Sequence, residues 1–419
     1  MAYPVTIDSF TNPVDANKQN SPNHATQHSA VNDAVEFLEA KVGVNSSAVT
    51  TSHDYKLSEV TGADKAVGKS ATQTFMYSNG IINSDGAITQ RSSSAGTVFS
   101  GNIYFDHWGQ VMSLDGGTDP TFNIFQYNNV TTSSDRSMMV WGTNGTGSGY
   151  GANSFHFVFQ KIENGARVYG GQYVTYSFKA FGVAGKKIGI YFVKNYGTGG
   201  IPTAQEVSAG QYITLSATAT VYSVTVAIPT NVGKTFGTTR NTDFLEIRMF
   251  YQWGTSIGIQ VGNTGVAETF SNGNININEC KLEVGTVATP YSPRTLQEEL
   301  LLCKRYYQKS YQLDVTPGTV IAGDGIIMTT VLDIATGNGG RWFLGIHVNF
   351  PIPMKSAPTA VRLWTTTGTL GSWTVGGADR ASIGLGNYSQ GFWLGNNTGS
   401  PITPTAGEAY GCWDAEAEI

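Results

Sequence analysis

The residues of this chain best suited to acid–base chemistry are carboxylates on strand-like segments. Glycoside hydrolysis needs two such groups about 5–10 Å apart, one acting as acid and the other as base or nucleophile. The chain has 30 Asp and Glu residues, so some pair is always available, and no spacing marks one out. We therefore predict a protein that is not an enzyme, with no catalytic residue. The acidic residues considered for such a pair are Asp106, Glu163, Asp243 and Glu246.

Two other patterns could bind a metal ion. His24 and His28 are four residues apart, which places both imidazoles on one face of a predicted helix. Asp115 and Asp119, in the segment LDGGTDP, could hold calcium in a loop. The histidine pair lacks a third ligand, and a glycine turn is the simpler explanation for LDGGTDP. The sequence also lacks the G-x-S-x-G, Walker A, HExxH and Cys-x-x-Cys patterns. We predict no metal site and no cofactor.

Aromatic side chains form a third group, because a flat ring can stack on the apolar face of a sugar. Five of the eight tryptophans follow residue 311, which favours sugar binding by the C-terminal part of the chain. Core packing or a subunit interface is the alternative for each single ring. The candidate sugar-binding residues are Tyr196, Trp253, Trp342, Trp364, Trp373, Tyr388 and Trp393.

Composition and alternation predict a mainly β fold for the elements that carry these side chains. Glycine contributes 51 residues, and charged residues only 13% of the chain, against a typical value of about 25%. Apolar and polar residues alternate in short runs between glycine-rich turns, as in antiparallel strands with one buried face. The clearest runs are residues 155–162, 173–182, 187–197, 212–229 and 243–253, followed by 326–334, 341–350, 360–366 and 390–395.

A first helix is predicted over residues 22–42. Ser21 can cap its start before Pro22, and Gly43 can end it. Four apolar residues in it are spaced 4, 3 and 4 apart, as in the seam of a coiled coil. We predict that this seam joins copies of the chain; a single amphipathic helix packed on its own domain is the alternative. The predicted oligomerisation residues are Val31, Val35, Leu38 and Val42.

A second, linking helix is predicted over residues 294–310. Thr295 and Glu298 have the spacing of a capping box, in which each side chain accepts a hydrogen bond from the other residue's backbone N–H. Pro290 and Pro293 precede it and end the strand-like run before them. The segment therefore predicts the end of one β domain and a helical connection to another.

Charge and hydropathy exclude several classes of partner. The net charge of −5 argues against nucleic acid, because phosphate binding needs basic patches. No window approaches the roughly 18 consecutive apolar residues of a membrane span, so we expect no membrane insertion. The first ten residues lack the basic and apolar regions of a secretory signal. Three cysteines, without paired spacing, fit synthesis in a reducing cytoplasm.

Several segments resemble tailed-bacteriophage tail fibres and related receptor-binding proteins. Residues 279–310, ECKLEVGTVATPYSPRTLQEELLLCKRYYQKS, resemble the junction at which a carbohydrate-binding-like jelly roll leads into an "E-L--C-RYY" helix. The phage jelly rolls also carry an "N-----QR------Y--D-W" pattern, matched here by Gln90, Arg91, Tyr104, Asp106 and Trp108. His107 stands where that family commonly has arginine; we expect the cluster to anchor the core rather than bind a ligand.

Three further segments match the same family. The pattern "H---HS-VNDA---LE-KVGV" resembles the region before the attachment or trimerising segment of fibre proteins. The segments 350–360 and 413–419 resemble the strand and turn, and the final strand, of fibre tips. The resemblance implies a homotrimeric virion protein, made in the host cytoplasm and placed in a tail or capsid-surface fibre. Its N-terminal part would contact other phage virion proteins, and its tip would bind a host surface polysaccharide.

The resulting domain prediction has four parts. Residues 1–72 form an arm, a helix and a connector; 73–293 a jelly-roll β-sandwich; 294–310 the linking helix; and 311–419 a C-terminal β-sandwich that binds the receptor. The function predicted is adsorption to a host cell-surface glycan. A tailspike-type polysaccharide depolymerase is one alternative, although no repeat of a parallel β-helix is present. A purely structural fibre, adaptor or capsid appendage is the other.

Overall fold

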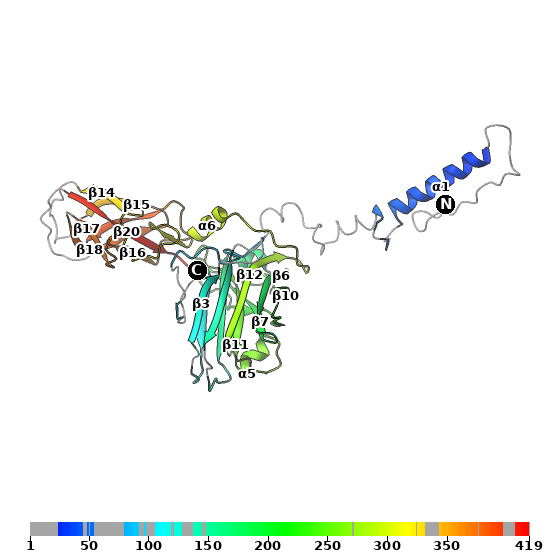
Figure 1. Ribbon diagram of the computed structural model, residues 1–419, viewed down its shortest axis with the longest axis horizontal. Coiled ribbons are helices and arrows are strands. Elements are labelled where there is room, and N and C mark those ends of the chain that lie inside the picture. Colours follow the sequence, from blue (N-terminus) through cyan, green and yellow to red (C-terminus); the bar gives the residue numbers. More distant parts are fainter. Residues whose placement is uncertain are drawn as a thin grey trace. The chain divides into compact units, whose positions relative to one another are not determined.

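A computed structural model of the chain confirms a mainly β fold built from antiparallel sheets (Figure 1). The chain divides into two units, residues 1–78 with 285–289, and residues 79–284 with 290–419. The residues that the structure describes are 24–44, 48–49, 51–53, 79–91, 96–97, 105–118, 121–127, 137–144, 148–269, 272–323, 325–331, 343–375, 377–396 and 407–418.

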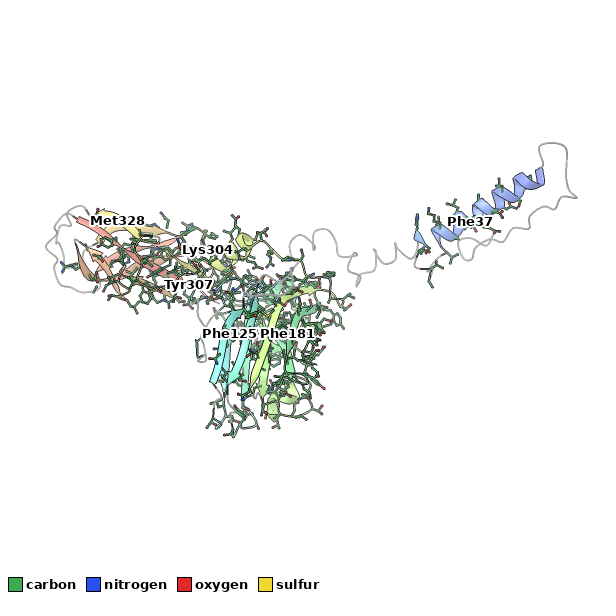
Figure 2. The ribbon with its side chains drawn as sticks, in the orientation of Figure 1. Phe37, Phe125, Phe181, Lys304, Tyr307 and Met328 are labelled. Atoms are coloured by element: carbon green, nitrogen blue, oxygen red, sulfur yellow. The ribbon has the colours of Figure 1, made fainter. Side chains whose placement is uncertain are left out.

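The first unit contains helix α1, His24–Val42. Gly43 ends it with a φ of 88°, a left-handed conformation that costs glycine little, as its predicted role as a C-cap requires. The predicted start at Ser21 and Pro22 lies outside the described residues. All four seam residues are exposed, and so is Phe37, which Figure 2 labels on the same helix. The helix therefore leaves an apolar stripe uncovered in the single chain.

The second unit begins with a β-sandwich, residues 79–284, which we call the central sandwich. One sheet has the order β1 (Gly96–Thr97), β3 (Thr121–Tyr127), β4 (Met138–Asn144), β12 (Gly273–Val284), β6 (Tyr173–Gly182) and β10 (Thr220–Ala227). The other has the order β2 (Gly109–Ser113), β5 (Phe155–Glu163), β11 (Phe244–Trp253), β7 (Lys187–Asn195) and β8 (Glu206–Val207), with β9 (Gln211–Thr214) also on β7. Two short helices, α4 (Gly165–Tyr169) and α5 (Thr255–Gln260), follow β5 and β11.

The alternating runs of the sequence form these strands because apolar faces of the two sheets meet in the main core. Tyr176 and Phe178 of one sheet and Ile247 and Met249 of the other belong to the same buried cluster. One run was predicted wrongly: 212–229 is two strands, β9 and β10. Between them the Ser216 hydroxyl accepts a hydrogen bond from the Thr218 backbone N–H at 3.1 Å, a local turn that interrupts the strand.

Helix α6, Leu296–Lys304, follows the central sandwich and is shorter than predicted. The capping box is confirmed, since Thr295 and Glu298 each accept from the other's backbone N–H, at 3.2 and 2.8 Å. The helix does not reach residue 310, because Tyr307–Lys309 form strand β13 and pair with the last strand of the chain. Strand pairing at this point replaces the last helical turn that the spacing alone suggested.

The C-terminal β-sandwich is organised around its last strand, β20 (Gly407–Glu416), which pairs with four others: β13, β14 (Ile327–Val331), β16 (Ala360–Trp364) and β17 (Ser372–Val375). Strands β18 (Ala378–Tyr388), β19 (Gly391–Asn396) and β15 (Phe343–Asn349) continue the sheet from β17. Its core includes Trp373, Phe392 and Trp413. Gly411 lets β20 pass close to Trp373, because an added Cβ would lie 2.5 Å from the Trp373 Cδ1 atom.

Candidate functional site

Several of the predicted sugar-binding aromatics are buried in the fold and offer no open ring face. Trp373 is fully buried and donates its Nε1–H to the carbonyl of Cys412 at 3.0 Å. Trp253 is equally buried and donates to the carbonyl of Val266 at 3.0 Å. Tyr196 is buried, with its hydroxyl on Glu206. A ring enclosed in this way cannot stack on a sugar, so we drop these three as candidates.

Trp364 does not provide an open ring either. Trp364 is half-buried and its Nε1–H donates to Asp414 at 2.8 Å. Gly318 lies against its ring, so that an added Cβ would come within 2.8 Å of the Trp364 Cζ3 atom. These contacts make Trp364 a support for the loop around Gly318. Trp342 lies outside the described residues.

Tyr388 and Trp393 are the predicted aromatics that the structure exposes. Tyr388 is 56% exposed and Trp393 is 41% exposed. They lie on the hairpin of β18 and β19, where Tyr388 pairs with Gly391. Gly391 and Trp393 are two residues apart on β19 and so face the same side of the sheet. Because directly paired residues also share a face, Tyr388 and Trp393 belong to one surface.

Strand β15 adds two polar side chains to this surface. His347 pairs with Trp393, and Asn349 pairs with Gly391. The His347 ring packs edge-to-face against the Trp393 ring, with centroids 4.8 Å apart. We call the surface formed by His347, Asn349, Tyr388 and Trp393 the aromatic platform. The sequence analysis named its two aromatics and missed its two polar members.

The platform has a defined hydrogen-bonding character. The Nδ1 atom of His347 lies 2.7 Å from the Asn349 Oδ1 atom, an acceptor, so Nδ1 carries the proton. In the neutral ring the Nε2 atom is then an acceptor. Asn349 is exposed and holds the ring in this tautomer. The platform thus combines two open aromatic rings with an acceptor that can take a hydrogen bond from a hydroxyl group.

Strand alternation and a tight hairpin turn fix the platform in place. The residues that alternate with the platform side chains along β15 and β19, Val348, Phe392 and Leu394, are buried in the C-terminal core. The turn at residues 389–390 is held from outside, since the backbone N–H groups of Phe350 and Met354 donate to its two carbonyls at 2.8 and 2.6 Å. Because one face of these strands is buried in the core, the platform side chains lie on the opposite face.

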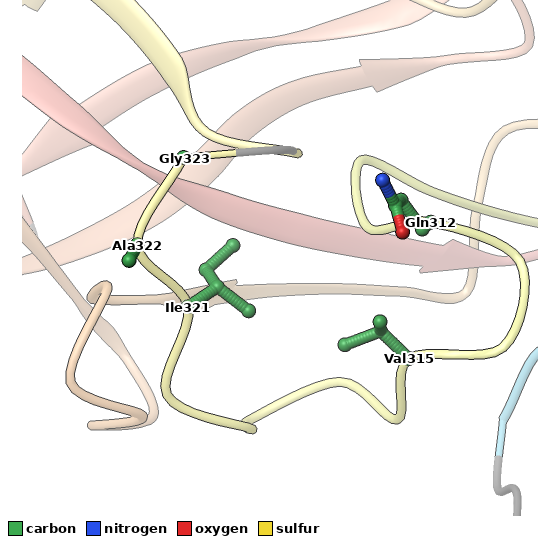
Figure 3. Close-up of a pocket in the computed structure, with 5 residues that line it drawn as sticks. All are labelled: Gln312, Val315, Ile321, Ala322 and Gly323. Carbon is green, nitrogen blue, oxygen red and sulfur yellow. The ribbon is translucent and has the colours of Figure 1, made fainter.

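A pocket on the same sandwich is lined by a loop that follows β13 (Figure 3). Its volume is about 390 Å³, enough for a small ligand. Figure 3 shows Val315 and Ile321 on opposite sides of the hollow, with the amide of Gln312 above. The loop is tied to the edge of the sheet by the Ile321 N–H, which donates to the carbonyl of Thr366 at 3.1 Å. This pocket supplies apolar contacts without an aromatic ring among its lining residues.

The four carboxylates considered for catalysis are each held by a cation. Arg305 binds Glu163 with two hydrogen bonds of 2.7 and 2.6 Å. The other ion pairs are Asp106 with Arg91, Asp243 with Arg167, and Glu246 with Arg248. Each of the four carboxylates therefore has an arginine as its partner within the fold.

The loop considered for calcium binding lies only partly within the described residues. Asp115 accepts a hydrogen bond from the Asn153 backbone N–H at 2.8 Å, whereas Asp119 lies outside the described residues. Across the described ranges, no group of three His, Cys, Asp or Glu side chains is arranged to hold a metal ion. None of the helices in this part of the chain is long and apolar enough to span a membrane.

Comparison with known proteins gives similarity at the level of structure alone. No model of a protein family matches the chain. No curated protein matches it either. Among solved structures, the enzymatically active domain of tailspike protein 4 of bacteriophage CBA120 is similar over 49% of this chain, at 14% identity and a TM-score of 0.29. That match covers 21% of the tailspike chain, so the similarity concerns about a fifth of its length.

Carbohydrate-binding modules are also among the similar structures. The family 11 module of a cellulosomal cellulase of Clostridium thermocellum matches 48% of this chain and 99% of its own, at 11% identity and a TM-score of 0.25. A family 30 module matches 46% of this chain and 99% of its own, at 10% identity and a TM-score of 0.26. Because all three TM-scores lie below 0.5, we infer the function from the residues of this chain alone.

Proposed function

We propose that this chain is a fibre-type virion protein of a tailed bacteriophage that binds a host cell-surface glycan and does not cleave it. The observation that carries the proposal is the aromatic platform of the C-terminal sandwich. The phage-like segments of the sequence, in the order of that family, support the virion role. The bound ligand would be a surface polysaccharide of the bacterial host.

The platform supports glycan binding because its chemistry is complementary to a sugar ring. A pyranose has apolar C–H faces and a rim of hydroxyl groups. The exposed rings of Tyr388 and Trp393 supply flat apolar surfaces, and the His347 Nε2 atom can accept a hydrogen bond from a hydroxyl. One such contact is weak, which suits a receptor binder that acts through several linked copies.

The α1 stripe supports the linkage of copies. Val31, Val35, Leu38 and Val42 are all exposed in the single chain, with the spacing of a coiled-coil seam. We assign this stripe to self-association into a homotrimer, the state that the family resemblance implies. The N-terminal part would also attach the fibre to other phage virion proteins. Phe37 is 77% exposed and lies outside the seam, where a bound partner could still contact it.

The direct test mixes the purified full chain with surface polysaccharide from candidate host strains and follows both protein retention and polymer length for several hours. Retained protein with an unchanged polymer is the expected result. Shortening of the polymer would assign the chain to the depolymerases and contradict the binder. Absence of retention with every host polysaccharide would instead favour a structural fibre, adaptor or capsid appendage.

A further inference from the structure

The loop between β13 and β14 is an Ω-loop, a loop whose two ends meet. Gly325, near its end, has a φ of 88° and lies against its start, where an added Cβ would come within 2.8 Å of the Ser310 carbonyl oxygen and the Tyr311 Cα atom. Loops of this type are packed by their own side chains, and many of them carry function. In this loop, residues from both limbs instead border the pocket of about 390 Å³ shown in Figure 3.

The first limb of the loop, residues 312–315, is fixed by the ammonium group of Lys309. Its Nζ atom donates to the carbonyl oxygens of Leu313 and Val315 at 2.9 and 2.6 Å. A third hydrogen bond, at 2.7 Å, goes to the carbonyl oxygen of Gln90 in the central sandwich. An ammonium group has three N–H donors, so Lys309 uses all of them in this way. The backbone of the first limb is therefore tied to residues outside the loop.

The second limb, residues 321–323, has an anchor of its own. The Ile321 N–H donates to the carbonyl of Thr366, in the turn after β16, at 3.1 Å. Between the limbs, the Gly318 N–H donates to the Tyr311 hydroxyl at 3.1 Å, and Gly318 lies against the Trp364 ring. These contacts hold the two limbs apart without a ligand, so the pocket is formed before a ligand binds.

The pocket offers apolar contacts and one neutral amide. Val315 and Ile321 are half-buried and face each other across the hollow, with the Gln312 carboxamide above them (Figure 3). Gly323 leaves one side open, because an added Cβ there would meet no atom within 4 Å. None of the described residues that line the pocket is charged or aromatic. Its chemistry therefore differs from that of the aromatic platform.

We propose that this pocket binds the acetamido group of an N-acetylated amino sugar, as a second subsite for the host glycan. The inference rests on the proposed function, since it names one class of sugar within that glycan. An acetamido group has an apolar methyl, an N–H donor and a carbonyl acceptor. The methyl matches Val315 and Ile321, and the amide matches Gln312, whose carboxamide both donates and accepts. A carboxamide makes several hydrogen bonds, so a bond within the protein leaves Gln312 able to bind a ligand.

Other common sugar substituents use this pocket less fully. A carboxylate that leaves water needs a cation or several donors, and the described lining residues supply no charge. A deoxy sugar such as fucose brings a methyl group but no partner for the amide of Gln312. A hydroxymethyl group places a hydroxyl against apolar side chains, which costs free energy unless it is hydrogen-bonded. The acetamido group uses both the apolar sides and the amide.

The expected preference follows from these two contacts. Burial of one methyl group is worth about a fourfold gain in affinity. One neutral hydrogen bond is worth about a fivefold gain. Together they favour an N-acetylated sugar over the parent hexose by roughly twentyfold.

Saturation-transfer NMR of the full chain with single sugars tests the pocket directly. The probes are N-acetylglucosamine and N-acetylgalactosamine, with glucose, galactose and fucose for comparison. We expect the acetyl methyl protons to receive the strongest saturation, and the N-acetylated sugars to bind roughly twentyfold more tightly than glucose and galactose. Equal affinity for the hexoses, or tighter binding of fucose, would overturn the proposal.

Two matched pairs of variants locate the site. Val315→Thr puts a hydroxyl group into the pocket at nearly constant volume, and Val320→Thr makes the same change at a valine that is 69% exposed and is not among the lining residues. Gln312→Leu removes the amide, and Gln297→Leu makes the same change at an exposed position of α6. We expect the first member of each pair to bind N-acetylated sugars roughly fourfold to fivefold more weakly, and the second to bind as the wild type does. Unchanged affinity in both Val315→Thr and Gln312→Leu would overturn the assignment.

Trp393→Ala separates the pocket from the aromatic platform. This variant should keep the acetyl methyl signal, and loss of the signal would place the N-acetylated sugar on the platform and overturn the proposal. A host polysaccharide that the wild-type chain retains, while no N-acetylated sugar binds, would overturn the pocket alone. Binding of N-acetylated sugars that depends on Val315 and Gln312, without retention of any host polysaccharide, would support the pocket and contradict the proposed function.

Discussion

Replacing Trp393 by alanine should weaken glycan binding without affecting the fold. The ring is 41% exposed, which corresponds to about 100 Å² of a tryptophan side chain of about 250 Å². If a sugar ring covers half of that surface, about 50 Å² of apolar area leaves water. At about 25 cal/mol per Å², the lost contribution is roughly 1.3 kcal/mol, close to a tenfold change in Kd.

Linked copies multiply this effect, so the assay must separate the single site from the assembly. Binding of short oligosaccharides, measured by calorimetry, should show the tenfold loss per site. Binding of the intact polysaccharide by an assembled protein should show a larger loss, because each engaged copy contributes to avidity. Thermal unfolding should change less than in Trp373→Ala, since the Trp393 ring is partly exposed and lies outside the C-terminal core.

A matched pair of tyrosine variants controls for exposure alone. Tyr388→Ala removes a platform ring that is 56% exposed, and Tyr173→Ala removes a ring on the central sandwich that is 58% exposed. We expect weaker binding from the first variant and wild-type binding from the second. Wild-type affinity in both Trp393→Ala and Tyr388→Ala would refute the assignment of the platform. Equal losses in Tyr388→Ala and Tyr173→Ala would refute its specificity.

Core packing and buried charge set the other expectations. Trp373→Ala should lower the free energy of unfolding by roughly 3–5 kcal/mol in urea titrations, in contrast to Trp393→Ala, because it empties a fully buried site; a loss below about 1 kcal/mol would contradict the packing. Gly391→Ala should lower the melting temperature, because the new Cβ would clash with the Val348 carbonyl and lie 2.7 Å from the imidazole paired with Trp393; an unchanged temperature would show that the strands move apart freely. Glu418→Gln should lower the free energy of unfolding by about 3 kcal/mol at pH 7, because the pKa of this carboxyl is lowered to about 2 in the folded chain. The contribution of the ionised carboxyl is fully present above pH 4.5 and disappears as the pH falls toward 2. A cost that does not change with pH would refute the ion pair.

Local patterns in the sequence predict much of the fold. The runs at 155–162, 173–182 and 243–253 become β5, β6 and β11, whose apolar residues lie in the buried clusters of the central sandwich. The capping box at Thr295 is set by residues three apart and needs no tertiary information. Long-range pairing decides where a local pattern stops: β13 at Tyr307–Lys309 is a strand because β20 lies beside it, more than a hundred residues later.

The candidate site was predictable only in part, for a related reason. Trp373 and Trp393 are the same residue type in similar strands, yet one is fully buried and the other is exposed. The register of each strand in the sheet selects the face, and register depends on partners that the sequence does not identify. His347 was missed because its place in the platform comes from its pairing with Trp393. The local signal for the platform face was the alternation of the polar residues His347 and Asn349 with the buried Val348.

Hydroxyl-radical footprinting of the full chain, with and without a retained host polysaccharide, tests the central claim most directly. The method reports solvent access of aromatic side chains. The account predicts protection of Tyr388 and Trp393 on binding, with unchanged labelling of Tyr173, whose exposure matches that of Tyr388. Unchanged labelling of the platform together with protection elsewhere on the chain would contradict it and place the glycan at another site.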